Sequence, residues 1–495
     1  MTEQTPLPAV RTYGQWRLPK GAGLLGLGTG GTVTLFVGII AVLIGVLIDV
    51  RLGLVVAVVV AAGMAPLLVR VNGRTGAQAM AARLAWWGGR RAGQDSYRSG
   101  PLSALPGGRA WLPGLLAPSM MLCAKDAYGR PFGLIKLPWA HHYTAVLRCN
   151  ADGAALVDAA QIDTWVANWG AWLAALAHEP GIAGVSVTIE TAPDSGQRLR
   201  SEVTRLIAPG APELATQVLQ QAARSYPAGS AQVATRVAIT WGPAMVSGRR
   251  EDTDILAEIG NRLPGLAEGL ARTGAGAAVP MTADALAETA RVAYDPGCAY
   301  DVDAARDDGP TGIGWADAGP IAAQEFWNCL RHDSGVSATW YMDEAPRGTV
   351  LSSVLTQLVS PHPQLTRKRV TLVYRPHNPG EAARIVDGDV RDAIFNATKN
   401  PRAKARATAD LRAAEQSADE EASGAGVVRF AMVVTVTVPS GAQLAATEAV
   451  VRNLAATARI RLRRAYGSQS AAFAAGLGVG MLLPHYASVG RLLAP

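Results

Sequence analysis

Two long uncharged apolar runs follow one another near the start of this chain and constrain its fold more than any other feature. No charged residue occurs between Lys20 and Asp49, and this stretch ends in the dense apolar run Val33–Ile48. A second uncharged run, Leu52–Val69, begins only a few residues later. About 18 helical residues rise about 27 Å, close to the roughly 30 Å hydrocarbon thickness of a bilayer. The sequence therefore predicts a transmembrane hairpin over residues 31–70, with antiparallel helices because the connection is short.

Positive charge is concentrated at the same end of the chain. Residues 1–100 hold ten Lys and Arg against three acidic residues, which accounts for the whole formal net charge of +7. The N-terminal tail, residues 1–30, and residues 71–98 are basic, whereas the tip of the hairpin carries one charge of each sign. The positive-inside rule then predicts that both termini are cytoplasmic. Because the other 395 residues balance in charge, we expect no strong direct binding of nucleic acid.

The segment after the hairpin combines tryptophan with arginine. Residues 74–91 read RTGAQAMAARLAWWGGRR. Tryptophan favours the headgroup depth of a bilayer, and arginine reaches lipid phosphates. Residues 71–98 are therefore predicted to form a basic interfacial helix, and a helix packed as a linker is the alternative. The residues expected to set membrane orientation and contact the interface are Arg51, Arg70, Arg74, Trp86, Trp87, Arg90 and Arg91.

Beyond this helix, strand-like and helix-like segments alternate. Prolines and glycines crowd residues 99–140, which indicates a connector. The alternation on both sides of residue 300 predicts two cytoplasmic split βαβ (ferredoxin-like) subdomains, residues 141–300 and 301–495. The fold class expected is thus a membrane-anchored α+β protein. The expected strands are Tyr143–Cys149, Val185–Ile189, Val233–Trp241, Val336–Met342, Val370–Tyr374 and Val427–Val438, and the expected helices are Ile162–Leu176, Pro212–Ser225, Asp254–Ala271, Gly380–Lys399, Arg402–Glu421 and Ala442–Arg464.

Motifs of familiar enzymes are missing or misplaced. Gly26, Gly28 and Gly31 match G-x-G-x-x-G, but they enter a predicted membrane span instead of following a strand. No G-x-x-x-x-G-K-[ST], H-E-x-x-H or G-x-S-x-G pattern occurs. His332-Asp333-Ser334 has the letters of a hydrolase triad, but adjacent residues have the wrong geometry, so we interpret it as a surface turn.

Metal and redox sites are not predicted either. We interpret the acidic residues between 301 and 308 as a solvated loop; they are Asp301, Asp303, Asp307 and Asp308. The cysteines lie far apart, which favours reduced, buried thiols over disulfides or a zinc site; they are Cys123, Cys149, Cys298 and Cys329. The sequence thus predicts no catalytic residue, no cofactor and no metal, and we expect a protein that is not an enzyme.

Three stretches are similar to parts of secretion proteins. The hairpin with its arginine-rich continuation resembles the two-helix inner-membrane subunit of type IV secretion systems, called PrgI in Gram-positive conjugation. Glu325–Pro376 looks like the N-terminal, non-ATPase part of conjugation ATPases, through Phe326-Trp327, Arg331-His332-Asp333-Ser334, Ala338-Thr339-Trp340-Tyr341, Ala345-Pro346-Arg347 and the strand Val370–Pro376. Ala345 stands where that family tends to have tryptophan. Arg463–Gln469 with Ala472–Gly478 resembles the family's helix end, although Leu477-Gly478-Val479-Gly480 replaces its Leu-Pro-Leu-Gly turn.

The resemblance implies an actinobacterial membrane protein of a type IV-like conjugation or secretion locus. In such proteins the hairpin is fused to the ATPase-like domain, while the motor is a separate chain. The implied function is a structural inner-membrane subunit that docks a separate hexameric ATPase at the cytoplasmic face. The implied partners are membrane lipid, that ATPase and further copies of the chain. The alternatives are an E-type component of a type VII secretion core complex and an orphan membrane enzyme.

Overall fold

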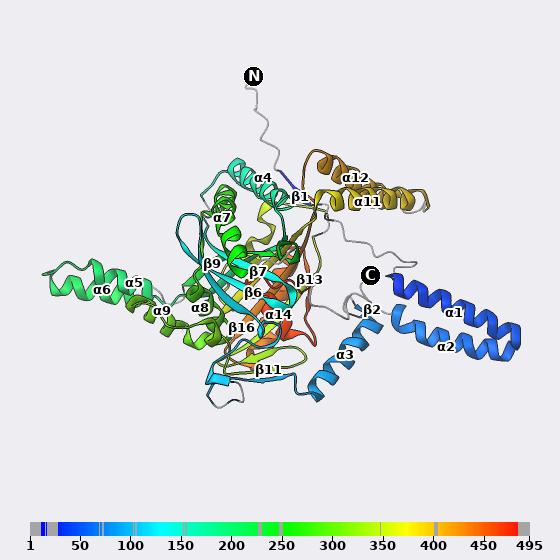
Figure 1. Cartoon of the computed structure of the whole chain (residues 1–495), viewed down its shortest axis with the longest axis horizontal. Helices are drawn as coiled ribbons and strands as arrows, with labels where there is room; N and C mark the ends of the chain where they lie inside the picture. The colour runs from blue at the N-terminus through cyan, green and yellow to red at the C-terminus, as the bar shows by residue number, and fades with distance from the viewer. Residues whose placement is uncertain are drawn as a thin grey trace, which may run out of the picture.

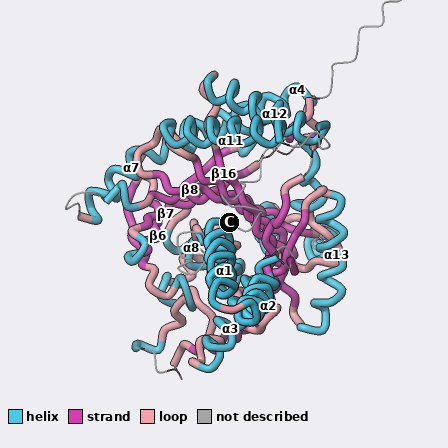
Figure 2. Tube along the Cα trace, turned by 90° about the vertical axis from the view of Figure 1, so that its right-hand side faces the viewer, coloured by secondary structure: helices cyan, strands magenta, loops and turns pink. Residues whose placement is uncertain are grey.

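One large antiparallel sheet runs through the computed structural model, and helices cover both of its faces, giving a mixed α+β fold (Figures 1 and 2). The structure describes residues 11–14, 16, 28–68, 70–71, 74–101, 103, 106–151, 153, 156–225, 230–246, 251–346, 348–399 and 404–483. The strands of the sheet are β4 (Ser96–Arg98), β5 (Met120–Lys125), β6 (Pro131–Leu137), β7 (His142–Asn150), β8 (Ile182–Pro193), β9 (Ala231–Trp241), β10 (Ala277–Pro280), β11 (Ala322–Glu325), β12 (Leu330–His332), β13 (Gly335–Glu344), β15 (Arg367–Pro376), β16 (Val428–Val438) and β17 (Arg461–Arg464).

The helices precede the sheet, connect its strands or, in the case of α14, follow its last strand. Their bounds are α1 (Gly28–Ile48), α2 (Val50–Leu68), α3 (Gly76–Arg91), α4 (Ala159–Leu176), α5 (Gln197–Leu206), α6 (Glu213–Ser225), α7 (Asp252–Leu270), α8 (Ala283–Tyr294), α9 (Ala299–Asp308), α10 (Thr356–Val359), α11 (Pro379–Lys399), α12 (Lys404–Ala422), α13 (Leu444–Thr457) and α14 (Gln469–Ala475). We call everything from β4 onward the body.

Each half of the body contributes four strands in the same spatial order. The first half has the order β10-β7-β9-β8, and the second half has the order β17-β13-β16-β15. The two groups meet edge to edge, where residues 368–374 of β15 pair with residues 185–191 of β8. We call this junction the seam. A single sheet therefore continues across the expected subdomain boundary at residue 300.

Alternation along the strands divides the core between the two faces of the sheet. Leu147 packs with residues of α4 and α7, and Val434 packs with residues of α13, on one face. Their chain neighbours Val146 and Val433 point to the opposite face, where α8 and residues 473–481 cover them. Successive side chains of a strand alternate in this way, so both faces are buried.

Each of the six expected strands coincides with a strand of the sheet, but the expected helix Ala442–Arg464 is wrong beyond Thr457. α13 ends at Thr457, and Arg459 has a left-handed φ of 54°. A left-handed residue with a side chain interrupts a helix. Residues 461–464 then form β17 against β13. The conformation of residues 461–464 is therefore determined by pairing with a strand more than a hundred residues earlier in the chain.

The Pro/Gly-rich connector also holds regular structure that we did not predict. Within it, β5 and β6 form an antiparallel hairpin. Gly129, with φ of 76°, lies in the turn, where the Asp126 carboxylate accepts hydrogen bonds from the N–H groups of Tyr128 (3.0 Å) and Arg130 (2.9 Å). Pro131 begins β6, a position that a strand tolerates. The proline and glycine mark the ends of strands here.

The expected acidic loop is α9, so that interpretation was also wrong. Asp303 accepts a hydrogen bond from Ser195 at 3.0 Å and pairs with Arg306 at 3.1 Å. Asp307 accepts hydrogen bonds from Gln197 at 3.0 Å and from Ser201. These carboxylates attach α5 to α9. The helices α5, α6 and α9 together form the arm at the left of Figure 1.

The cysteines are free thiols, as expected, but they are not all buried. Cys149 is buried in β7, and burial raises the pKa of its thiol to about 11. Cys123 is exposed on the edge strand β5, and Cys298 and Cys329 are half-buried. Cys123 is therefore the thiol most open to labelling reagents among the four.

The last described segment crosses the middle of the sheet. Residues 472–482 are buried, and the Gly480 carbonyl accepts a hydrogen bond from Thr240 of β9 at 3.2 Å. Gly478 and Gly480 have φ of 76° and 74°. A Cβ on Gly480 would lie 2.4 Å from both Thr144 Cγ2 and Thr240 Oγ1, and one on Gly478 would lie 2.6 Å from Thr188 Oγ1. Only glycine allows this backbone to approach the strands so closely.

The interpretation of His332-Asp333-Ser334 as a surface turn holds for Asp333 and Ser334, which connect β12 to β13, but it is wrong for His332, which is fully buried at the end of β12. Its Nδ1 lies 2.5 Å from the Tyr294 carbonyl oxygen, and its Nε2 lies 2.7 Å from Ser337 Oγ. A carbonyl only accepts, so Nδ1 carries the proton and Nε2 accepts from Ser337. Burial lowers the pKa of His332 to about 4, and the charge of Arg369 adds to this effect. The imidazole is a neutral structural group.

We expect His332→Gln to make the free energy of unfolding less dependent on pH between 6.5 and 4. The unfolded chain binds the proton near pH 6.5, whereas the folded protein resists it until about pH 4. Stability is therefore full above pH 6.5 and is lost as the pH falls, by roughly 3 kcal/mol over the interval. Urea unfolding of both proteins in detergent at stepped pH measures this. Equal pH dependence would contradict it.

Candidate membrane interface

α1 and α2 form an antiparallel pair that projects from the body (Figures 1 and 2). Glycines at their contact keep the helices close. A Cβ on Gly45 would lie 3.1 Å from Gly53 Cα, and one on Gly38 would lie 2.6 Å from a methyl group of Val60. Small residues at such contacts are typical of helices that pack within a bilayer.

Within the described residues, α1 is the one helix that is both long and apolar enough to cross a membrane. Its candidate span is Gly31–Ile48, whereas the apolar part of α2, Val50–Ala65, is shorter. Aliphatic side chains cover the outside of the pair, and Leu47 is 85% exposed. An apolar surface of this kind marks a membrane or protein contact. Of the two expected spans, one helix therefore has the length and composition of a span.

α3 has two different sides. Met80, Leu84 and Trp87 recur at intervals of four and three residues and are all at least half exposed, so they form one apolar stripe. The Arg91 guanidinium carbon lies 3.4 Å from the centroid of the Trp87 ring. Trp86, on the other side, packs edge-on against Trp327 of the body, with centroids 5.4 Å apart. We call the exposed side the α3 stripe.

The residues expected at the membrane interface therefore do not all lie on one surface. Trp87 and Arg91 lie exposed at the α3 stripe, whereas Trp86 anchors α3 to the body, as in the linker alternative. Arg90 is exposed beside Trp86, with its guanidinium 5.4 Å from that ring. Arg51 is exposed in the first turn of α2, where its N–H donates to the Asp49 carboxylate at 2.8 Å. The backbones of Arg70 and Arg74 lie in the antiparallel ladder of β2 (Arg70–Val71) and β3 (Arg74–Thr75), and their side chains are outside the described residues.

The chain ahead of α1 is also bound to the body. Tyr13, in β1 (Tyr13–Gly14), pairs with Val350 of β14 (Thr349–Val350), and its hydroxyl donates to Asp163 Oδ1 of α4 at 2.6 Å. Trp16 packs edge-on against Phe430 of β16, with centroids 6.0 Å apart. We call Tyr13 and Trp16 the N-terminal strap. Sequence reasoning missed it, although two aromatic residues in a polar tail were a signal.

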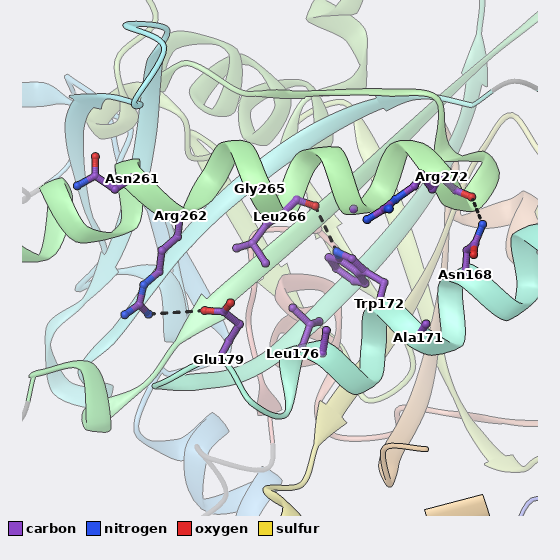
Figure 3. Close-up of a pocket in the computed structure, with 12 residues that line it drawn as sticks. Asn168, Ala171, Trp172, Leu176, Glu179, Asn261, Arg262, Gly265, Leu266 and Arg272 are labelled. Atoms are coloured by element: carbon purple, nitrogen blue, oxygen red, sulfur yellow. Dashed lines mark hydrogen bonds and ion pairs between the residues drawn. The ribbon is translucent and has the colours of Figure 1, made fainter. Parts of the chain in front are cut away.

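A groove lies between α4 and α7 (Figure 3). Its volume is about 600 Å³. Trp172, Leu176 and Leu266 give it an apolar lining, and the Trp172 indole N–H donates to the Leu266 carbonyl at 3.2 Å. Arg262, 3.9 Å from Glu179, supplies polar edges. Trp172 is 7% exposed and belongs to the core on this face of the sheet.

The comparisons with known proteins concern the N-terminal part of the chain. Residues 20–78 match a family model described as a domain of unknown function, DUF8461. The match spans α1 and α2 and reaches the start of α3, and it does not extend into the body. No curated protein matches the chain.

Proposed function

We propose that this chain is a structural inner-membrane subunit of a type IV-like conjugation or secretion apparatus. In this proposal α1 and α2 both span the membrane, both termini are cytoplasmic, and the body docks a separate hexameric ATPase. Each half of the body is taken as a split βαβ (ferredoxin-like) unit, because its strand order matches that fold. The proposal includes no catalytic step.

The observation that carries the proposal is that both flanks of the helix pair contact the same body. The N-terminal strap binds β14, α4 and β16 ahead of α1, and α3 binds the body through Trp86 after α2. If α1 alone crossed the membrane, these flanks would lie on opposite sides of it. An even number of spans is needed, and α2, with 19 residues, is about 28 Å long. Basic flanks then favour the cytoplasm.

The α3 stripe supports a body held close to the lipid. Its three apolar side chains would enter the headgroup region, and arginines beside them would meet lipid phosphates. Because Trp86 fixes α3 to the body, lipid contact along the stripe would set the distance between body and membrane.

For the ATPase contact we expect the groove between α4 and α7. In Figure 1 these helices lie at the top of the body, away from α1 and α2 at the right, where a cytoplasmic partner has access. An apolar lining with polar edges is the anatomy of a small binding hot spot. Gly265 opens the groove, since a Cβ at this position would meet no atom within 4 Å. A larger side chain there would fill the groove without disturbing the fold.

Co-purification from native membranes in mild detergent tests the proposal. The wild-type chain is expected to bring down a hexameric ATPase with a P-loop, and Gly265→Trp is expected to lower its recovery at least tenfold. Gly388→Trp is the matched control, because Gly388 also lies in a helix with open space around it. Protease added outside spheroplasts should leave the body intact. Loss of the body, or recovery of the chain without any ATPase in several detergents, would overturn the proposal.

A further inference from the structure

A cluster of charged side chains is buried at the seam, on the face of the sheet that residues 472–482 cover. It consists of Glu190 of β8, Arg236 of β9, and Arg367 and Arg369 of β15, each less than 9% exposed. Glu190 Oε2 lies 2.6 Å from Arg236 Nη2, and Glu190 Oε1 lies 2.9 Å from Arg367 Nη1. The register places Arg369 directly opposite Glu190. We call these four residues the seam cluster.

The seam cluster has more cationic donors than acceptors. No described residue accepts a hydrogen bond from Nε, Nη1 or Nη2 of Arg369, or from Nε of Arg236, and solvent does not reach these atoms. The Arg369 guanidinium lies 4.6 Å from the centroid of the Phe473 ring. Both oxygens of Glu190 are engaged by the other two arginines. The cluster thus holds three guanidinium groups and one carboxylate, and the charge of Arg369 has no ion-pair partner among the four residues.

This surplus cannot be removed by deprotonation at neutral pH. Burial lowers the pKa of Arg369 to about 10, which leaves the group charged. Contact with an aromatic face offsets part of the desolvation of a buried cation, but it satisfies no N–H donor in the plane of the guanidinium. Buried polar groups without protein partners usually mark a bound water or ion. The cluster has a surplus of positive charge as well as N–H donors without acceptors. An anion would balance both, whereas water would balance only the donors.

Further arginines continue the cluster toward the surface. Arg148 of β7 is exposed and lies in register with Arg236 on the adjacent strand. Desolvation of its inner part is the main cause that lowers the pKa of Arg148, and the positive charge of Arg306 of α9 is the next. Arg306 is itself paired with Glu288 at 2.6 Å. A row of positive side chains attracts anions from solution and raises their local concentration.

We propose that Arg236 and Arg369 bind a small inorganic anion, chloride or phosphate, beside Glu190 in the seam cluster. Arginine donors in a planar fork suit such anions. Arg236 belongs to the first half of the body and Arg369 to the second, so the anion joins the two halves across the seam. This inference does not depend on the proposed function.

Thermal unfolding of the full chain in detergent tests the anion site. Chloride or phosphate replaces gluconate, a larger organic anion, at constant ionic strength and pH 7. We expect a saturable rise in Tm of about 5 °C at about 100 times the Kd, and the two arms identify which anion binds. Arg369→Met should abolish the rise. Arg224→Met, on the exposed face of α6, is the control that should keep it.

Two outcomes would overturn the proposal. One is a wild-type Tm that does not change with either anion, and the other is the same rise in Arg369→Met as in the wild type. We expect Arg369→Met to fold, because it removes an unpaired buried charge. If it does not, crystals of the wild-type chain grown in bromide give a second measurement. A bromide peak in anomalous scattering within about 3.5 Å of an Arg369 nitrogen is expected, or phosphate density there in crystals grown in phosphate, and maps that show neither would contradict the proposal.

Discussion

Glutamine in place of Glu190 is expected to lower the free energy of unfolding by about 3–5 kcal/mol, one of the two largest effects that the structure predicts. The substitution keeps the size of the side chain but removes the carboxylate that Arg236 and Arg367 share. Three buried guanidinium groups would then repel one another without a counter-charge in the cluster. Replacing one partner of a buried ion pair is far more harmful than replacing both.

The titration of Glu190 predicts how the loss of stability in Glu190→Gln depends on pH. Burial alone would raise the pKa of Glu190, but Arg236, Arg367 and Arg369 outweigh it and hold the pKa far below the usual range. A lowered pKa contributes stability above the unfolded value near 4.5, and this stability is lost as the pH falls. The difference between wild type and Glu190→Gln should therefore be largest at neutral pH and shrink in acid.

Denaturant unfolding at pH 7 measures the effect against two further variants. Glu420→Gln changes an exposed carboxylate of α12 and should stay within about 0.5 kcal/mol of wild type. The double variant Glu190→Gln with Arg369→Met removes one negative and one positive charge. It should recover part of the loss, because the two sites are in contact across the strands. Equal stability of Glu190→Gln and Glu420→Gln would show that the negative charge of Glu190 does not stabilise the fold.

The strands that sequence could locate are those with a strong pattern of their own. Val233–Trp241 and Val427–Val438 are runs of β-branched residues, and both lie on central strands, β9 and β16. β17 has the residues Arg-Leu-Arg-Arg, which carry no strand pattern. It becomes a strand because the edge of β13 accepts it, with Arg464 opposite Trp340. Tertiary pairing of this kind is not visible in a local window.

The candidate membrane interface shows the same division between local and distant information. Composition alone indicated α1, α2 and the tryptophan-arginine helix, because each is a continuous segment. The contacts that orient them join residues far apart in the chain: Tyr13 with Asp163, and Trp86 with Trp327. The seam cluster was missed for the same reason, since Glu190 and Arg369 look like isolated charges within two separate strands. Arg367-Lys368-Arg369, at the start of an apolar strand, was the available signal.

Alanine in place of Gly480 is expected to destabilise the body by about 2–5 kcal/mol, through two separable causes. The left-handed φ of 74° costs a residue with a Cβ about 1–2 kcal/mol. The new methyl group would also lie 2.4 Å from Thr144 and Thr240, and such overpacking costs about 1–3 kcal/mol more. The buried segment would have to move away from the sheet, and the bond from Thr240 to the Gly480 carbonyl would be lost.

Gly424→Ala separates the two causes. Gly424 follows α12 with φ of 95°, and a Cβ there would meet no atom within 4 Å. This variant should therefore show the conformational cost of about 1–2 kcal/mol without the steric one. Denaturant unfolding of both variants gives the difference, which measures how tightly residues 476–482 press on the threonines of the central strands. If Gly480→Ala lost no more stability than Gly424→Ala, the segment would not be packed against the sheet as described. Gly478 and Gly480 would then be needed only for their left-handed backbone conformation.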